Sequence, residues 1–499
     1  MQTGDSAKAG FDASRERFEG VLEFLSGEAA ASLTHGDLED RLSVEGRELI
    51  RQLLQDHLDL RAHKEKRLDE VADTKGTPRR AVEAGHDRPL TTVFGEVKVE
   101  RLAYRRRGHP NLHPADAALN LPQEKHSHGL RQLAAIESSR GSFDGAVEAI
   151  GRSTGQRLGK RQVEDLAQRA ACDFDEFYAG RKPPLGAAGD VLILSCDGKG
   201  IVMRPDALRA ATADAAAKAT KKLQTRLSKG EKRNRKRMAE VGAVYDATPV
   251  ARTPADILPA DNARDVVHAP AATNKWLVAS VTKDAASVVG QIFDEAARRD
   301  PGHERGWVAL VDGNNHQIDR IQAEAQKREV TVAIVIDFIH VLEYLWKAAW
   351  CFFHEGDPGA ERWVRDKAFA VLSGNATRVA GAIRRTATTH GLGKASREKA
   401  DACANYLTNK RPFLDYPTAL ERGWPIATGV IEGACRHIVK DRMDLTGARW
   451  GLDGVDAVLK LRALMSNGDF ADYWRYHLKQ ERQRVHQSCY ADNVIPQAA

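Results

Sequence analysis

Three carboxylates stand in sequence contexts that suit a metal site. Asp197 and Asp312 each follow a run of apolar residues and precede a glycine, as expected at the end of a buried strand. Glu432 lies in Gly-Val-Ile-Glu-Gly-Ala-Cys-Arg (429–436), which predicts the opening of a helix. Mg²⁺ prefers hard oxygen ligands, and two such ions about 4 Å apart can stabilise both the attacking and the leaving oxygen of a phosphodiester. The three residues therefore predict cleavage or transfer of phosphodiester bonds.

The middle acid has a second candidate. Asp337 also ends an apolar run, 332–336, and His340 follows three residues later. His340 could contact a DNA phosphate or support the site, and a satisfied, partly buried histidine is the simpler interpretation. Asp-Gly is common in turns, so either aspartate taken alone would more often be a turn residue. The metal-site interpretation thus requires that the acids converge in three dimensions.

The acids can meet only if one sheet holds the aspartates and a helix brings the glutamate beside it. Within 186–350, apolar runs alternate with segments of helical period, which predicts an α/β fold with a mixed sheet covered by helices. Residues 338–420 have helical character throughout and separate Asp312 from Glu432, so they predict a helical insertion. Strands are predicted at about 190–196, 199–203, 238–246, 276–282, 307–311 and 331–337, and helices at about 284–299 and 314–329.

These changes of period divide the chain into five segments. The first is mainly helical and contains a short β-hairpin around Gly95, where the period changes from helical to alternating. The segments are 1–125, the N-terminal helical region; 126–185, a helix-turn-helix-like DNA-binding region; 186–345, the first part of the catalytic core; 346–424, the helical insertion; and 425–499, the second part of the core with the helical glutamate, plus the C-terminal tail.

Two segments are candidates for contact with DNA. A helix over about 142–152, a turn with Gly and Ser, and a second helix would leave Lys160 and Arg161 free to meet phosphates or base edges. Ten basic residues and one acidic residue fall within 218–237, a strip that could neutralise phosphates. An ordinary pair of packed helices and a solvated loop are the simpler alternatives. The last part of the strip contains Arg233, Arg235, Lys236 and Arg237.

Further basic residues follow Glu432. Arg436 and Lys440 stand four and eight positions after it, so an α-helix would place all three on one face. There the two basic residues, together with Arg442, could grip DNA, and a surface ladder of ion pairs is the alternative. Trp450 could stack on an extruded base, although a core tryptophan is the competing interpretation.

The composition excludes several classes of protein. The 499 residues carry a formal net charge of +6, with 42% hydrophobic and 29% charged residues, which is typical of a globular and mildly basic chain. The six cysteines form no Cys-x-x-Cys pair, so we expect neither a disulfide framework nor a zinc site, and reduced thiols fit a cytoplasmic location. No apolar stretch is long enough to span a bilayer, and the first 30 residues lack a signal-peptide core, so no membrane partner is expected.

Five motifs, taken together, resemble those of a known family. They are Ser-Cys-Asp-Gly-Lys-Gly-Ile (195–201), Val-Asp-Gly (311–313), Asp-Phe-Ile-His-Val-Leu-Glu-Tyr-Leu-Trp (337–346), Gly-Val-Ile-Glu-Gly-Ala-Cys-Arg (429–436) and Lys-Asp-Arg-Met-x-x-Thr-Gly-Ala-Arg-Trp (440–450). This set resembles a bacterial insertion-sequence transposase of the ISKra type, a group related to Mutator-like DDE transposases. The likeness covers about 90–480.

The resemblance implies an RNase H-like core with a helical domain inserted before the glutamate. It implies that Asp197, Asp312 and Glu432 are the catalytic, metal-binding triad. In the Mutator-like pattern an Asp-x-x-His element follows the second acid. Asp337 and His340 look like that element, which leaves Asp312 as the acid. The cofactor implied is a pair of Mg²⁺ ions, with Mn²⁺ as a substitute.

The resemblance also implies the partners. They are double-stranded DNA, at the terminal inverted repeats and at the target, and at least a second copy of the chain, since two DNA ends must be brought together. Many relatives place cysteine pairs after the N-terminal hairpin, whereas 104–109 contains none, which again predicts no zinc. Two alternatives remain open: a non-catalytic DNA-binding protein derived from a transposase, and an RNase H-fold nuclease without strand transfer.

Overall fold

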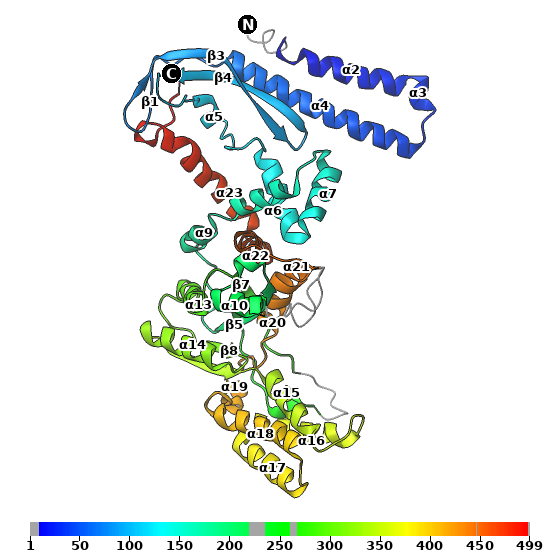
Figure 1. Ribbon diagram of the computed structural model, residues 1–499, viewed down its shortest axis with the longest axis vertical. Coiled ribbons are helices and arrows are strands. Elements are labelled where there is room, and N and C mark those ends of the chain that lie inside the picture. Colours follow the sequence, from blue (N-terminus) through cyan, green and yellow to red (C-terminus); the bar gives the residue numbers. More distant parts are fainter. Residues whose placement is uncertain (1–8, 219–234, 260–266, 446, 498–499) are drawn as a thin grey trace. The chain divides into compact units, whose positions relative to one another are not determined.

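The chain forms two compact units in its computed structural model, which describes residues 9–218, 235–259, 267–445 and 447–497 (Figure 1). One unit comprises Met1–Ala179 together with Asp469–Ala499, and the other comprises Gly180–Gly468. The candidate acids all fall in the second unit. Among the described residues, no helix combines the length and the apolar character needed to cross a bilayer.

The first unit begins with a helical hairpin and a β-hairpin. Helix α4 is capped by Thr34, whose hydroxyl accepts a hydrogen bond from the amide of Asp37 at 3.3 Å. The β-hairpin is longer than the sequence indicates, and it turns at Gly95, whose φ of +141° suits glycine. The elements are α2 (Asp12–Ser26), α3 (Glu28–Ala31), α4 (His35–His63), β1 (Val71–Ala72), β2 (Pro78–Arg79), β3 (Ala81–Thr92), β4 (Gly95–Arg105) and α5 (Pro114–Ala118).

A group of helices completes this unit. Two of them match the predicted helix-turn-helix pair: α7 ends at Gly155, which has a φ of +73°, and α8 begins at Lys160. The C-terminal helix joins this group, because the Tyr473 hydroxyl donates to the carbonyl of Ala170 at 2.6 Å. The sequence assigned 425–499 to the second part of the core plus a C-terminal tail, and the chain from Asp469 onward belongs to the first unit. The helices are α6 (His128–Arg140), α7 (Phe143–Thr154), α8 (Lys160–Ala170), α9 (Phe174–Gly180) and α23 (Phe470–Glu481).

The second unit contains a mixed five-stranded sheet in the order β7-β6-β5-β8-β9. Strand β6 is antiparallel to both of its neighbours, β5 and β7, whereas β5, β8 and β9 run parallel to one another. Strand β8 and the first part of β5, Val191–Leu194, are apolar and buried, because helices cover the sheet. The strands are β5 (Val191–Val202), β6 (Lys236–Ala247), β7 (Ala272–Ser280), β8 (Trp307–Val311) and β9 (Val332–Ile336).

One strand prediction was wrong. The segments 190–196 and 199–203 form a single strand, β5, which pairs with β6 along its whole length. Its glycines do not make a turn. A Cβ at Gly198 would lie 2.9 Å from Met238 Cε, and one at Gly200 would lie 2.8 Å from Lys236 Cδ. Both glycines therefore make room for side chains of β6.

Helices surround the sheet and occupy the chain between β9 and Glu432. Helix α13 packs on β5 and β6, α22 packs on β7, and α20 packs on β5 and β6. The helices between β9 and α20 separate Glu432 from the last strand of the sheet along the chain. The helices are α10 (Ala210–Lys218), α12 (Pro254–Ile257), α13 (Ala285–Arg299), α14 (Asn315–Lys327), α15 (Phe338–Ala349), α16 (Pro358–Leu372), α17 (Ala376–Thr389), α18 (Lys394–Asn409), α19 (Tyr416–Glu421), α20 (Gly429–Ala434), α21 (Asp441–Met443) and α22 (Leu452–Ser466).

Candidate metal centre

Three aspartates lie along one edge of the sheet. The register pairs Ser195 with Leu310, so continuing it by two residues places Asp197 beside Asp312. The next pair of strands ends on Val311 and Ile336, which places Asp312 beside Asp337. Asp312 and Asp337 follow the ends of the parallel strands β8 and β9, whereas Asp197 lies inside β5, just beyond the part that pairs with β8, and does not end its strand as the sequence predicted. The parallel register nevertheless places the three aspartates in one row across these strands.

Asp197 connects this edge to the helix that carries the glutamate. It is half-buried, and its Oδ1 accepts from the amide of Gly198 at 2.6 Å. Its Oδ2 accepts from the Cys435 thiol at 3.3 Å. Cys435 stands three residues after Glu432, so this contact holds the end of α20 against β5. Burial, and then the charge of Asp197, raise the pKa of the Cys435 thiol, which therefore stays protonated and able to donate.

Asp312 is held by a glycine turn and a tyrosine. Its Oδ1 accepts from the amide of Asn314 at 2.8 Å, and its carbonyl accepts from the Tyr406 hydroxyl at 3.1 Å. Gly313 has a φ of +91°, and a Cβ there would lie 2.7 Å from the Tyr406 hydroxyl oxygen. Only glycine fits at this position, which explains why a glycine follows Asp312. The turn leaves Asp312 in its place directly after β8.

Asp337 plays a different part, because it is fully buried and its carboxylate is already engaged. Oδ1 accepts from the amide of Ile339 at 2.9 Å and so caps α15. Oδ2 accepts from the Thr428 hydroxyl and lies 3.3 Å from Nδ1 of His340. Thr428 is the residue that precedes α20. Asp337 thus ties the end of β9 to the start of the helix that bears Glu432.

Of the predicted triad, only Glu432 belongs to a tight group of possible metal ligands. Asp337, His340 and Glu432 each offer a ligand atom within 4.8 Å of the other two. In the part of the chain that the structure describes, no group of three this tight contains Asp197 or Asp312. Asp197 and Asp312 therefore do not form a tight group of three possible ligands with Glu432.

The electrostatics of the edge suit a cation. Asp197 and Asp312 are half-buried and Glu432 is exposed, and within the described ranges none of the three forms an ion pair with a basic side chain. Burial and the negative charges of Glu240, Asp197 and Asp312 raise the pKa of Cys196 to about 12. The Lys410 ammonium interacts electrostatically with Asp312, and a divalent ion with hard oxygen ligands would offset the remaining negative charge of this edge. Asp197, Asp312 and Glu432 offer carboxylate oxygens, the type of ligand that Mg²⁺ prefers.

Sequence reasoning missed two groups at this edge. Glu240 on β6 pairs with Gly198, and burial raises the pKa of its carboxyl, with Asp197 adding to the effect. Thr428 anchors α20 through Asp337. A single glutamate inside the otherwise uncharged run 238–245 is a signal that could have revealed Glu240. Nothing local in the sequence marks Thr428.

The basic residues after Glu432 do not follow the predicted spacing. Cys435–Lys440 forms a π-helical stretch, whose turns are wider than those of an α-helix. Arg436 and Lys440 are both exposed, but the wider turns shift them from the common face with Glu432 that four-residue spacing predicts. π-Helical turns are frequent at functional sites.

Arg442 and Trp450 are buried, which agrees with the core interpretation of Trp450 and leaves neither side chain exposed for direct contact with DNA. The Arg442 guanidinium lies 4.7 Å from the centre of the Trp450 ring, and burial lowers its pKa to about 10. The Trp450 indole donates to the carbonyl of Met443 at 3.1 Å, and its amide donates to the carbonyl of Val202. Trp450 is a core residue that fastens this segment to the end of β5.

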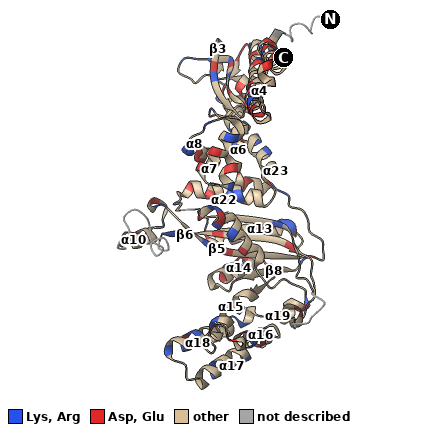
Figure 2. Cartoon of the chain, turned by 90° about the vertical axis from the view of Figure 1, so that its right-hand side faces the viewer, with Lys and Arg blue, Asp and Glu red and all other residues tan. Residues whose placement is uncertain are grey.

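The other basic candidates are spread over both units. Lys160 and Arg161 are exposed at the start of α8, and Lys160 pairs with Asp144 at 2.6 Å. Arg233 lies outside the described residues, as does most of the strip 218–237. Figure 2 shows basic residues where β6 begins, next to α10. There Lys236 is exposed and Arg235 is half-buried, while Arg237 is half-buried and donates to the carbonyl of Val281 at 2.8 Å.

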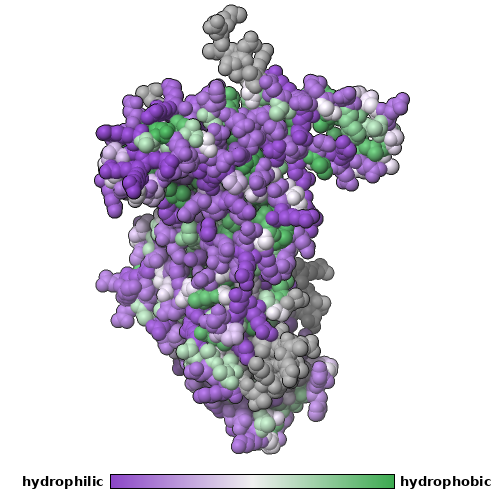
Figure 3. Space-filling view, turned by 45° about the horizontal axis from the view of Figure 1, so that its top comes forward, coloured by the Kyte–Doolittle hydropathy of each residue, from purple (hydrophilic) through white to green (hydrophobic). Residues whose placement is uncertain are grey.

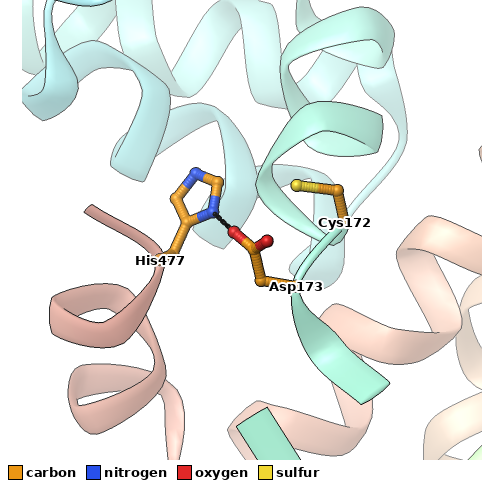
Figure 4. Close-up of side chains that lie close together, drawn as sticks. All are labelled: Cys172, Asp173 and His477. Carbon is orange, nitrogen blue, oxygen red and sulfur yellow. Dashed lines mark hydrogen bonds and ion pairs between the residues drawn. The ribbon is translucent and has the colours of Figure 1, made fainter. Parts of the chain in front are cut away.

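A second cluster of possible ligands, in the first unit, has a structural role. Cys172, Asp173 and His477 offer atoms within 4.8 Å of one another, and in Figure 4 the imidazole points at the Asp173 carboxylate. Asp173 accepts from His477 Nδ1 at 2.6 Å and from Arg484 at 2.6 Å, so a guanidinium already supplies the positive charge. Burial raises the pKa of Cys172 to about 11, which leaves a neutral thiol. The cluster joins α23 to the chain after α8.

Comparison with known proteins adds no assignment, since neither a protein-family model nor a curated protein matches the chain. The interpretation of the site depends on its own geometry and chemistry.

Proposed function

We propose that the protein is a DDE transposase that cleaves DNA and transfers strands of an insertion sequence with the help of divalent metal ions. The observation that carries the proposal is the row of aspartates on adjacent parallel strands beside the helix of Glu432, with no ion pair to the accessible acids among the residues that the structure describes. The mixed sheet with helices around it supports the RNase H-like core that the sequence resemblance implies. The helices between β9 and α20 occupy the position expected for an inserted domain.

The chain would contribute rigid carboxylates at a fixed edge. Two bound Mg²⁺ ions would supply charge neutralisation and activation of the attacking oxygen. The sheet fixes the direction of Asp197 and Asp312, and Asp337 with Thr428 fixes the start of the helix that presents Glu432. In the first reaction water displaces the 3′-oxygen from phosphorus, and in the second the freed 3′-hydroxyl attacks a phosphodiester of the target. Each reaction breaks one P–O bond and forms another, so no oxidant or covalent protein intermediate is required.

The first unit would recognise the DNA ends. Helices α7 and α8 form the pair predicted for DNA contact, with Lys160 and Arg161 exposed at the start of α8. Contacts of this kind are strongly weakened by salt.

An oligomer would hold two ends together. The helical hairpin α2–α4 exposes an unusual number of large apolar side chains, some of which are visible in green in Figure 3. Contiguous exposed apolar surface is typical of a protein interface. The exposed residues are Phe18, Leu22, Leu25, Leu33, Val44, Ile50 and Leu53.

The test is cleavage of a labelled duplex that carries the DNA flanking the gene on each side. We expect the wild type to cut it in Mg²⁺ or Mn²⁺, and Asp197→Ala, Asp312→Ala and Glu432→Ala to lose cleavage by ~10³-fold or more while still binding the duplex. Glu361→Ala, an exposed glutamate on α16, is the matched control and should cut normally. Cutting by all three acid variants would refute the site.

The same reactions separate the competing functions. Joining of the cut strand to a supercoiled target distinguishes a transposase from a nuclease that only cleaves. Binding without any cleavage by the wild type would indicate a non-catalytic DNA-binding protein.

A further inference from the structure

A pocket opens between helices α15 and α18, and nothing in the metal centre uses it. Its volume is about 280 Å³, near the lower end of the range (about 300 Å³ and above) for pockets that enclose a small ligand. It is therefore of a size that suits one flat heterocycle. Its lining includes Tyr344, Lys347, Trp350, Ser396 and Lys399.

Two aromatic side chains, Trp350 and Tyr344, line the pocket. Trp350 keeps 48% of its surface exposed, although a tryptophan is costly to leave in water. It lies against Trp346, with ring centres 5.2 Å apart and planes inclined by 28°, so its orientation is fixed while part of its surface stays open. Tyr344 is held in the same way by Tyr406, with ring centres 4.0 Å apart and planes inclined by 14°.

The pocket also carries positive charge. The Lys347 ammonium lies 5.0 Å from the centre of the Tyr344 ring, and its pairing with the exposed Glu343, at 3.4 Å, is a weak surface contact. Lys399, on α18, is exposed. Two ammonium groups beside aromatic rings match a ligand that has both a flat ring and a phosphate.

The pocket is joined to the metal centre by a short chain of contacts. Tyr344, in the pocket lining, stacks on Tyr406, whose hydroxyl donates to the carbonyl of Asp312 at 3.1 Å. Asp312 in turn marks the end of β8. A DNA strand whose phosphate lies at the aspartates could therefore place a nearby nucleotide in the pocket.

We propose that this pocket binds one unpaired nucleotide of the DNA strand next to the cleavage position, with its base against Trp350 and its phosphate near Lys347 and Lys399. The proposal rests on the proposed function, because it requires DNA at the metal centre. Removing a base from the duplex stack is unfavourable, and stacking on an aromatic face offsets that loss. The binding is tolerant of sequence, since every base has a flat face. The buried Trp450 cannot serve this role, whereas Trp350 can.

The test compares two DNA probes in EDTA, so that no cleavage occurs. One is a blunt duplex, and the other is the same duplex with a short single-stranded thymine overhang that contains 5-iododeoxyuridine. We expect fluorescence anisotropy to show tighter binding of the overhang probe. Trp350→Ala should reduce that preference by about 5- to 100-fold, the range for loss of one stacked base. Trp350→Phe should retain most of it, and irradiation should cross-link the overhang to the segment 344–351.

Matched controls and separate outcomes keep the two proposals distinct. Phe369→Ala removes an exposed aromatic residue of α16 outside the pocket, and Lys394→Ala removes an exposed lysine at the start of α18, so neither should change the preference. The double variant Lys347→Ala/Lys399→Ala should lower the affinity for the overhang probe and make that affinity less dependent on salt. Cleavage of the blunt duplex in Mg²⁺ with no preference for the overhang, or cross-links elsewhere in the chain, would overturn the pocket alone. Failure to bind either probe would overturn both proposals.

Discussion

The contact between Thr428 and Asp337 gives the sharpest test of how the glutamate is positioned. Thr428→Val keeps the size of the side chain and removes the hydroxyl that donates to the fully buried Asp337 carboxylate. A hydrogen bond to a charged group contributes about 1.5–3 kcal/mol, so the free energy of unfolding should fall by that amount. In a domain of this size each kcal/mol lowers Tm by about 2–4 °C, so Tm should fall by about 3–10 °C.

The catalytic effect should exceed what stability explains. Thr428 precedes α20, and without its anchor the helix can shift relative to the strand ends, where a displacement of about 1 Å can cost ~10²-fold in rate. We expect kcat for duplex cleavage to fall by at least ~10-fold and the Mg²⁺ concentration at half-maximal rate to rise, while duplex affinity stays within about twofold. The assay is single-turnover cleavage over a range of Mg²⁺ concentrations, at a temperature well below the Tm of the variant.

Thr428→Ser is the matched control, because it restores the hydroxyl at the same position. It should recover most of the rate and the original Mg²⁺ dependence. If Thr428→Val unfolds at the wild-type temperature and responds to Mg²⁺ like the wild type, the contact does not position Glu432. If the serine variant is as slow as the valine variant, loss of the hydrogen bond is not the cause.

Two further predictions follow from individual contacts. Asp173 has a pKa of about 2, because its imidazole and guanidinium partners outweigh the opposing effect of burial. Its charge therefore stabilises the fold above the ordinary pKa of 3.8, and this stability is lost as pH falls toward 2. Asp173→Asn should lower the free energy of unfolding in urea by about 1–2 kcal/mol at pH 7 and by progressively less below about pH 4. An equal loss at pH 7 and below pH 4 would contradict the ion-pair account. Gly313→Ala should cost about 1–3 kcal/mol and slow cleavage, because its Cβ would meet the Tyr406 hydroxyl at a positive φ. Gly290→Ala, inside helix α13 with open space around it, should instead raise the free energy of unfolding by about 0.5–1 kcal/mol in thermal melts.

The buried strands could be predicted because their signals are local. The run Trp307–Val311 is apolar at every position, as expected of a strand that is buried on both faces of a sheet. Strand β8 occupies these same residues. Helix α13 also agrees with its predicted span, because its apolar residues recur at helical spacing. The error at β5 arose because glycine signals both a turn and a close approach of neighbouring side chains, and only the partner strand decides between them.

The candidate acids were also found from sequence, but their arrangement was not. An aspartate after an apolar strand is visible in the chain, and the parallel register that aligns Asp197, Asp312 and Asp337 is not. A similar apolar run precedes Asp312 and Asp337, yet Asp312 is half-buried, whereas Asp337 is fully buried. The Asp337 carboxylate accepts a hydrogen bond from Thr428, which is 91 residues away in the chain. Burial of Trp450 against Arg442 likewise depends on a distant contact with the end of β5.

The amino-acid sequence by itself determined where most strands and helices form and which residues are candidates for a metal site, because periodicity, caps and residue type act over a few neighbouring positions. The tertiary structure alone decided which acids share an edge, which of them is already saturated with hydrogen bonds, and which tryptophan remains open to a ligand. Those properties depend on contacts between residues that are far apart along the chain. Such contacts follow from the packing of whole elements, which no short stretch of sequence specifies.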